Sequence, residues 1–236
     1  MESQPQFQQT SVEHSSVDER ATFITRTYLH LLGAVVALVG LEVVLFKTGF
    51  AESFTSIVLR GQYTWLAVLG GFMLLGTVAS AMARRASSLA VQYAGLGLFV
   101  VGQAIILCPL LFIAFSYAGS ELISVAAQIT GIAFAGLTAI AVWSRRDLSG
   151  MGPYLRWVSF GAIGMIVASI LLGFQLGVLF FGAMILLAGG YILYTTSAIM
   201  RHYPTTHYVS ASLELFSSLA LMFWYVLQLL LSMSRD

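Results

Sequence analysis

The sequence contains few charged residues. Of its 236 residues, 11 are Lys or Arg and 10 are Asp or Glu, so that 9% are charged, against about a quarter in soluble domains. With 58% apolar residues and a mean hydropathy of +0.89, the chain cannot cover itself with a water-soluble surface. The net charge of +1 provides no basic surface for a phosphate backbone, so we expect no nucleic-acid partner.

Lysine and cysteine each occur once. Lys47 lies outside the long apolar runs, which excludes a retinal-type seven-helix protein, because its Schiff base requires a lysine amine deep in the bundle. Cys108 cannot form an internal disulfide, and beside Pro109 in an apolar run it is interpreted as a small buried hydrophobic residue.

Histidines are also scarce and dispersed. His14 lies in the polar N-terminal segment, His30 lies one turn inside the first apolar run, and His202 and His207 lie in a single connection. Their spacing matches no metal-site pattern, and none places an activating base beside a serine at the same depth. The sequence therefore predicts no enzyme, no metal site and no cofactor.

Seven apolar runs are long enough to cross a bilayer, which takes about 20 residues. The connections between them are short. The sequence predicts an all-α integral membrane protein with spans at about Thr25–Phe46, Gln62–Ala83, Leu89–Tyr117, Glu121–Trp143, Tyr154–Phe174, Leu176–Met200 and Tyr208–Ser232.

Residues 1–20 differ from the rest, since Gln, Ser and acidic residues dominate and no apolar period appears. We expect a disordered cytoplasmic tail there and a membrane domain over residues 21–236. No signal-peptide pattern precedes the first run. With the tail inside, eight of the 11 Lys and Arg residues fall on the inner side, so the positive-inside rule favours a cytoplasmic N-terminus. The C-terminus is then outside, unless the seventh run is re-entrant.

Two acidic residues lie inside the runs rather than at their first or last residue. Glu42 is one turn from the outer end of the first run, where its side chain can reach headgroups or water, so a structural role is favoured. Glu214 lies about 9 Å inside the seventh run, too deep for a short carboxylate to escape, and ionisable groups at such depth mark candidate sites. Helical spacing places three serines on the same face as Glu214: Ser210, Ser217 and Ser218.

The charge state of Glu214 stays open at this point. A nearby arginine would keep the carboxylate charged, and Arg26 and Arg201 are assigned to the same side of the membrane. Alternatively, Glu214 is a protonated or snorkelling residue that neighbouring hydroxyls satisfy. The sequence does not decide between a functional site and this structural role.

Four stretches together resemble the Bax-inhibitor-type membrane protein family, specifically its bacterial YccA-like branch. They are Arg26-Thr27-Tyr28, residues 144–149 (SRRDLS), residues 190–197 (GYILYTTS) and the final run from Tyr208-Val209 to the terminal Ser234-Arg235-Asp236. The resemblance extends over residues 25–236. It implies a bundle of six helices around a central seventh, in a bacterial inner membrane.

In better-studied relatives, two aspartates near the inner face form a pH-sensitive pair linked to calcium leak. The corresponding positions here are Thr195 and Ser218, so the paired-carboxylate device is missing. Because Glu214 lies one turn before Ser218, we hypothesise a displaced single-acid sensor of protons or calcium ions.

YccA-like proteins are also associated with the membrane protease FtsH as substrates and modulators. That resemblance makes an FtsH modulator or substrate the first functional hypothesis, with the polar tail from Met1 to Glu19 as a handle for the protease. The alternative hypothesis is a pH-sensitive cation leak channel that has lost the paired aspartates.

Overall fold

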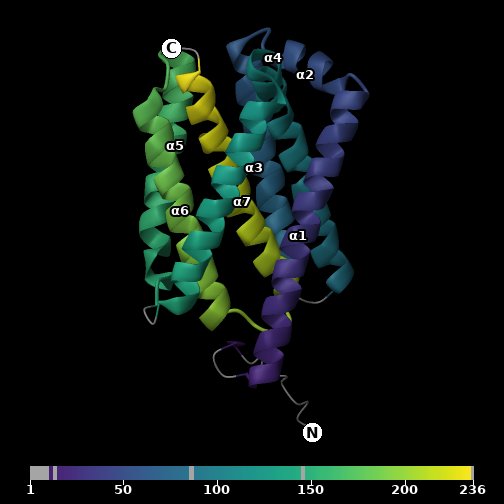
Figure 1. The fold of residues 1–236 in the computed structure, drawn as a ribbon, viewed down its shortest axis with the longest axis vertical. Helices are drawn as coiled ribbons and strands as arrows, with labels where there is room; N and C mark the ends of the chain where they lie inside the picture. The colour runs from purple at the N-terminus through teal and green to yellow at the C-terminus, as the bar shows by residue number, and fades with distance from the viewer. Residues whose placement is uncertain (1–10, 13–14, 85–87, 145–146, 235–236) are drawn as a thin grey trace, which may run out of the picture.

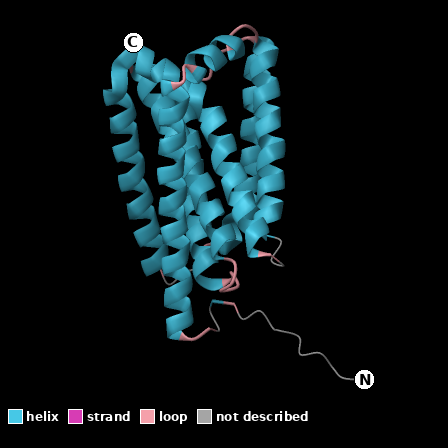
Figure 2. Ribbon diagram, turned by 90° about the vertical axis from the view of Figure 1, so that its right-hand side faces the viewer, coloured by secondary structure: helices cyan, strands magenta, loops and turns pink. Residues whose placement is uncertain are grey.

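The computed structural model of the chain describes residues 11–12, 15–84, 88–144 and 147–234. Within these residues every long element is a helix, and the helices run side by side between two ends of a bundle (Figures 1 and 2). The elements are α1 (Val17–Lys47), α2 (Phe50–Val58), α3 (Gln62–Arg84), α4 (Leu89–Trp143), a 3-10 turn (Ser149–Met151), α5 (Gly152–Leu172), α6 (Val178–Arg201) and α7 (Tyr208–Met233).

The long helix α4 contributes two spans. Its 55 residues would extend about 82 Å if straight, far more than the roughly 30 Å of hydrocarbon in a bilayer. At Gly119 the backbone leaves the helical region, with φ 67° and ψ −163°, and the chain turns back (Figure 1). The first limb, residues 89–118, and the second limb, residues 120–143, confirm the two separate spans predicted from the sequence.

The two ends of the bundle are named from Figure 1. The lower end holds the first residues of α1, the last residues of α3 and the connection between α6 and α7, whereas the upper end holds Gly119 and the last residues of α7. Six helices of the described chain are long and apolar enough to cross a membrane, and α4 counts twice. Helix α7 extends from one end to the other, so it spans the bundle and is not re-entrant.

Helix α7 occupies the interior. It packs against α1, α3, α4 and α6, and its Tyr225 joins a cluster with Leu155 and Ala162 of α5. Phe216 and Leu227 of α7 are almost fully buried. The predicted all-α membrane bundle around a central seventh helix is therefore confirmed.

Glycines allow some of these helices to touch. A Cβ atom built on Gly95 of α4 would lie 2.7 Å from the carbonyl oxygen of Ala79 in α3, and one on Gly190 of α6 would lie 2.9 Å from Leu155 of α5. A larger residue at Gly95 would meet the backbone of α3 and push the helices apart, whereas one at Gly190 would displace the Leu155 side chain. Gly161 and Gly164 of α5 have nothing within 4 Å of such a Cβ.

Two elements differ from the sequence prediction. Helix α1 begins at Val17 rather than Thr25, because Ser16 and Glu19 form a capping box in which each side chain accepts from the other residue's backbone N–H. Residues 17–20 are therefore helical and not disordered. In the first upper connection, α2 forms a short amphipathic helix that buries Ala51, Thr55 and Val58.

Candidate functional site

Glu214 forms an ion pair at the lower end of the bundle. Its carboxylate oxygen Oε1 lies 3.7 Å from a guanidinium nitrogen of Arg84, the last residue of α3, and their side chains are 28% and 63% exposed. This distance is too long for a hydrogen bond, so the attraction is electrostatic. Sequence reasoning had considered Arg26 and Arg201 as partners, and it missed Arg84 because only the fold brings the ends of α3 and α7 together.

Tyr203, in the connection between α6 and α7, is the second partner of Glu214. Burial raises the pKa of Tyr203, and the negative charge of Glu214 and a side-chain hydrogen bond to it raise that pKa further, while Arg84 opposes the shift. The phenol therefore stays protonated and can donate its hydrogen to the carboxylate. Glu214, Arg84 and Tyr203 form what we call the lower cluster.

Ser11 and Val12, before α1, contact the connection that carries Tyr203 of this cluster. Val12 is fully buried, and its backbone N–H donates to the carbonyl oxygen of Tyr203 at 3.0 Å. Ser11 pairs with Pro204 in an antiparallel bridge. Since Val12 belongs to the same apolar cluster as Phe216 of α7, these residues hold the connection between α6 and α7 against the lower end.

The serines predicted on the face of Glu214 have different surroundings. Ser218 is buried and its hydroxyl donates to the carbonyl oxygen of Glu214 at 3.0 Å, so it satisfies the helix backbone. Ser210 is likewise buried. Thr195 is buried on α6, which packs against α7. Ser217 differs, because it lines a cavity.

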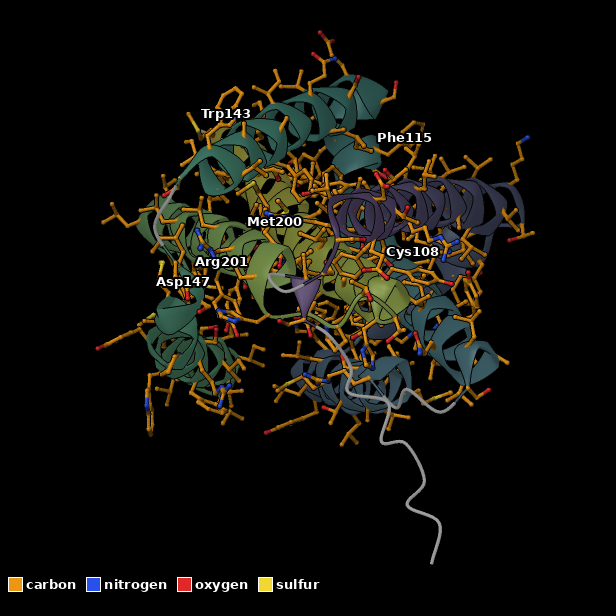
Figure 3. The ribbon with its side chains drawn as sticks, turned by 90° about the horizontal axis from the view of Figure 1, so that it is seen from below. Cys108, Phe115, Trp143, Asp147, Met200 and Arg201 are labelled. Atoms are coloured by element: carbon orange, nitrogen blue, oxygen red, sulfur yellow. The ribbon has the colours of Figure 1, made fainter. Side chains whose placement is uncertain are left out.

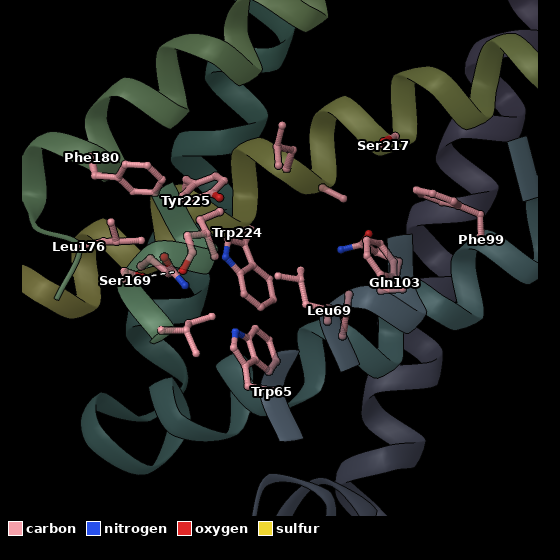
Figure 4. A pocket seen from close by; sticks show the side chains of 17 residues that line it. Trp65, Leu69, Phe99, Gln103, Ser169, Leu176, Phe180, Ser217, Trp224 and Tyr225 are labelled. Carbon is pink, nitrogen blue, oxygen red and sulfur yellow. Dashed lines mark hydrogen bonds between the residues drawn. The ribbon is translucent and has the colours of Figure 1, made fainter. Parts of the chain in front are cut away.

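That cavity, of about 290 Å³, lies between α3, α4, α5 and α7 (Figure 4). It starts one helical turn above Glu214 at Ser217 and reaches Leu176, in the upper connection between α5 and α6. Gln103, Ser169 and Gln228 place polar atoms along its otherwise apolar wall. A water molecule occupies about 30 Å³ of liquid, so the cavity can hold several.

Arg26, proposed as a partner of Glu214, lies elsewhere. Its guanidinium carbon stands 5.5 Å from the ring centre of Tyr208, as in a cation–π contact. One turn later, His30 Nδ1 donates to the Arg26 carbonyl oxygen at 2.7 Å. In the neutral ring Nε2 then accepts from the Tyr93 hydroxyl at 2.8 Å. This aromatic group links α1, α4 and α7.

Arg201 ends α6 and is followed by a second polar group. His202 Nε2 lies 3.1 Å from Asp147 Oδ2 and 3.1 Å from Ser149 Oγ, and Asp147 and Arg201 lie on the same side of the lower end (Figure 3). Hydrogen bonds from Ser149 and, to a smaller degree, His202 lower the pKa of Asp147 to about 2. Serine and aspartate share one ring nitrogen, so this is not a catalytic triad, which needs them on opposite nitrogens.

The surroundings of Glu42 differ from those expected from the sequence. Its side chain does not reach headgroups or water, because the residue is only 7% exposed and neither carboxylate oxygen has a hydrogen-bond partner. The helix turns this face of α1 inward, toward Cys108 of α4. The simple rule that a residue one turn from a helix end can snorkel fails here because the first limb of α4 covers it.

The two ends of the expected protease handle, Met1 and Glu19, have different standing in the structure. Met1 lies outside the described residues. Glu19 belongs to the capping box of α1 and therefore to the rigid helix. Among the residues that the structure describes, no three His, Cys, Asp or Glu side chains gather as a metal ion would require.

The family assignment follows from the match of the whole helical bundle. The sequence profile of the family described as "Inhibitor of apoptosis-promoting Bax1" matches residues 20–236, from the first turns of α1 to the end of the chain. This chain belongs to the Bax1-inhibitor family. The assignment confirms the resemblance to the family that the four sequence stretches indicated.

Individual relatives of this Bax1-inhibitor family member are distant. An uncharacterized protein of Neisseria meningitidis serogroup B is 28% identical over 58% of this chain and 61% of its own length. The protein named LIFEGUARD 3 of Arabidopsis thaliana is 26% identical over 61% of this chain and 59% of its own length. An uncharacterized protein of Pseudomonas aeruginosa is 29% identical over 47% and 50%. The matched region spans only about three fifths or less of these relatives.

Proposed function

We propose that this chain is a pH-sensitive cation leak protein, in which protonation of Glu214 opens the lower end of the bundle to ions that include calcium. The observation that supports this proposal is the ion pair between Glu214 and Arg84, one turn below the serine that lines the internal cavity. An ion pair one helical turn from a cavity that contains several polar atoms is suited to control entry into it.

The chemistry of the lower cluster gives the direction of the pH response. The charged carboxylate attracts Arg84 and accepts from Tyr203. Once Glu214 takes up a proton, it loses its attraction for Arg84, whose exposed side chain moves into water. The contact between the ends of α3 and α7 loosens, and cations gain access to Ser217. Leak is therefore fastest at low pH.

The expected size of the response is modest. A partly exposed ion pair contributes about 0–1 kcal/mol, so its loss shifts a closed-to-open equilibrium by roughly fivefold at most. The packing of the helices and the burial of Val12 supply the rest of the free energy that favours the closed state.

The test is calcium uptake into liposomes that contain the purified chain, measured with an enclosed dye at pH 8 and pH 4. The wild type should take up calcium faster at pH 4, whereas Glu214→Gln should be fast and nearly equal at both values. Glu52→Gln on α2, which changes an exposed acid at the upper end, is the matched control and should behave as the wild type. Uptake no faster than in empty liposomes, or an unchanged pH response in Glu214→Gln, would contradict the proposal.

Interaction with FtsH as substrate or modulator remains a second candidate function, supported by the resemblance to YccA-like proteins. The anchoring of Val12 bears on it, because a protease handle would have to lie before that residue. Ten residues span at most roughly 33 Å. Removing Met1–Thr10 should slow turnover of the chain in cells that contain the protease and leave its turnover unchanged in cells that lack it. If the shortened chain and the full chain are degraded equally fast in cells that contain the protease, the handle is rejected.

A further inference from the structure

A surface groove runs along the crevice between α1 and the first limb of α4. Its upper part is apolar, has a volume of about 720 Å³, and contains Gly33, Ala37 and Gly40 of α1 together with Gly97 of α4. Below it lies a polar pocket of about 550 Å³, which contains Arg26 of α1 and Gln92 of α4 among others.

The glycines of the groove do not serve helix packing. A Cβ atom on Gly33, Gly40 or Gly97 would have nothing within 4 Å, whereas one on the neighbouring Gly95 would meet backbone of α3 at 2.7 Å. Glycine inside a helix is unfavourable by about 1 kcal/mol relative to alanine. In the groove these glycines leave space at the protein surface because they have no side chains, and a molecule from outside the chain would have to fill the groove.

The two pockets follow one another along α1 and together make what we call the strip; they share no lining residue, and the rings of His30 and Tyr208 make contact between them. On α1 the lining residues follow at three- and four-residue steps from Arg26 through His30 and Gly33 to Ala37 and Gly40, so they share one face of the helix. The strip from Arg26 to Gly40 is about 21 Å long, while one leaflet contributes about half of the 30 Å of bilayer hydrocarbon. Its length suits one acyl chain with its headgroup.

The polar pocket contains an unsatisfied acceptor. Gln92 is only 3% exposed, and its side-chain oxygen has no hydrogen-bond partner. A buried acceptor without a donor costs about 1–3 kcal/mol. Because Gln92 lines the pocket, a donor bound there would remove this cost.

The charges around the pocket select the headgroup. Arg26 offers a cation, and the hydroxyls of Thr205 and Thr206 offer donors, which together suit a phosphate. Asp18 and Glu19 line the same pocket and suit an ammonium group. With two acids against one arginine, a purely anionic headgroup is disfavoured relative to one that carries both a phosphate and an ammonium.

We propose that this groove is a binding site for one glycerophospholipid with a phosphoethanolamine headgroup, whose acyl chain lies over Gly33 and Gly40. Arg26 binds the phosphate, and the ammonium donates to Asp18, beside Gln92. The site is separate from the lower cluster and does not rest on the proposed cation leak.

Native mass spectrometry of the delipidated chain in mild detergent tests the site. Phosphatidylethanolamine and phosphatidylglycerol with identical acyl chains are titrated separately. The wild type should bind phosphatidylethanolamine about tenfold more tightly than phosphatidylglycerol. Gly33→Leu, whose Cβ atom would meet nothing within 4 Å, places a side chain in the groove and should weaken this binding about tenfold. Gly161→Leu on α5, where a Cβ also meets nothing within 4 Å, is the matched control and should bind as the wild type.

A second variant separates headgroup from chain recognition. Arg26→Gln should weaken binding of the ethanolamine lipid while the chain still elutes as a folded species in gel filtration. The proposal is overturned if phosphatidylglycerol binds as tightly as phosphatidylethanolamine, or if Gly33→Leu retains wild-type binding. It is also overturned if soluble glycerophosphoethanolamine, which lacks acyl chains, competes as well as the lipid does.

Discussion

At the scale of single residues, sequence reasoning located Glu214 but not its partners. The depth of an acid in an apolar run is readable from hydropathy, and so is the serine face around it. The ion pair to Arg84 joins helices that are far apart in the chain, so only the packing of α3 against α7 creates it. Glu42 shows the opposite failure, since its distance from a helix end gave no sign that α4 would bury it.

His207, just before α7, carries a pH-dependent contribution to stability. Burial lowers the pKa of its imidazole, so the folded chain takes up this proton less readily than the unfolded chain, whose histidine titrates near 6.5. The contribution is present above that value and is lost as the pH falls below it. In detergent, His207→Gln should reduce the drop in unfolding temperature between pH 7.5 and pH 5. An unchanged drop in His207→Gln would show that other groups cause it.

At the scale of elements, hydropathy predicted the spans well and their ends less well. The separation of the third and fourth spans was visible because Gly119 and its polar neighbours interrupt the apolar run. The start of α1 was placed eight residues late, because its first turn is charged and is held by a cap rather than by burial. Helix α2 was missed, since nine residues in a connection are too short for a membrane criterion, although its buried positions follow a helical period.

The turn inside α4 depends on a glycine. Gly119 has φ 67° and ψ −163°, a region that residues with a Cβ avoid at a cost of about 1–3 kcal/mol. Gly119→Ala should therefore lower the thermal unfolding midpoint of the purified chain. The same change at Gly131, which lies in the second limb with open space around a Cβ, should leave the midpoint equal or slightly higher, because alanine favours helix. Equal midpoints for both variants would mean that the turn tolerates a side chain.

At the scale of the whole molecule, the fold gives the path of the chain but not the direction in which it faces. Seven spans place Ser16 and Ser234 at opposite ends of the bundle. We propose that the lower end faces the cytoplasm of a bacterial inner membrane, because five of the six Arg residues that the structure describes lie toward it, and only Arg60 lies toward the upper end.

Cysteine labelling tests this orientation. The native Cys108 is buried, so a membrane-impermeant maleimide added to intact spheroplasts should label Ser234→Cys and spare Ser16→Cys until the membrane is opened. Equal labelling of both variants in intact spheroplasts would contradict a full span by α7, and the reverse pattern would contradict the proposed direction.

The central claim is that the attraction between Arg84 and Glu214 holds the lower end closed, and exchanging the two charges tests it most directly. Calcium uptake into liposomes at pH 8 is measured for Arg84→Glu, for Glu214→Arg and for the double exchange. Each single change places like charges together and should raise uptake several-fold, while the double exchange should return it toward the wild-type rate, since paired residues are not additive. Uptake in the double variant equal to the sum of the two single increases would contradict the account.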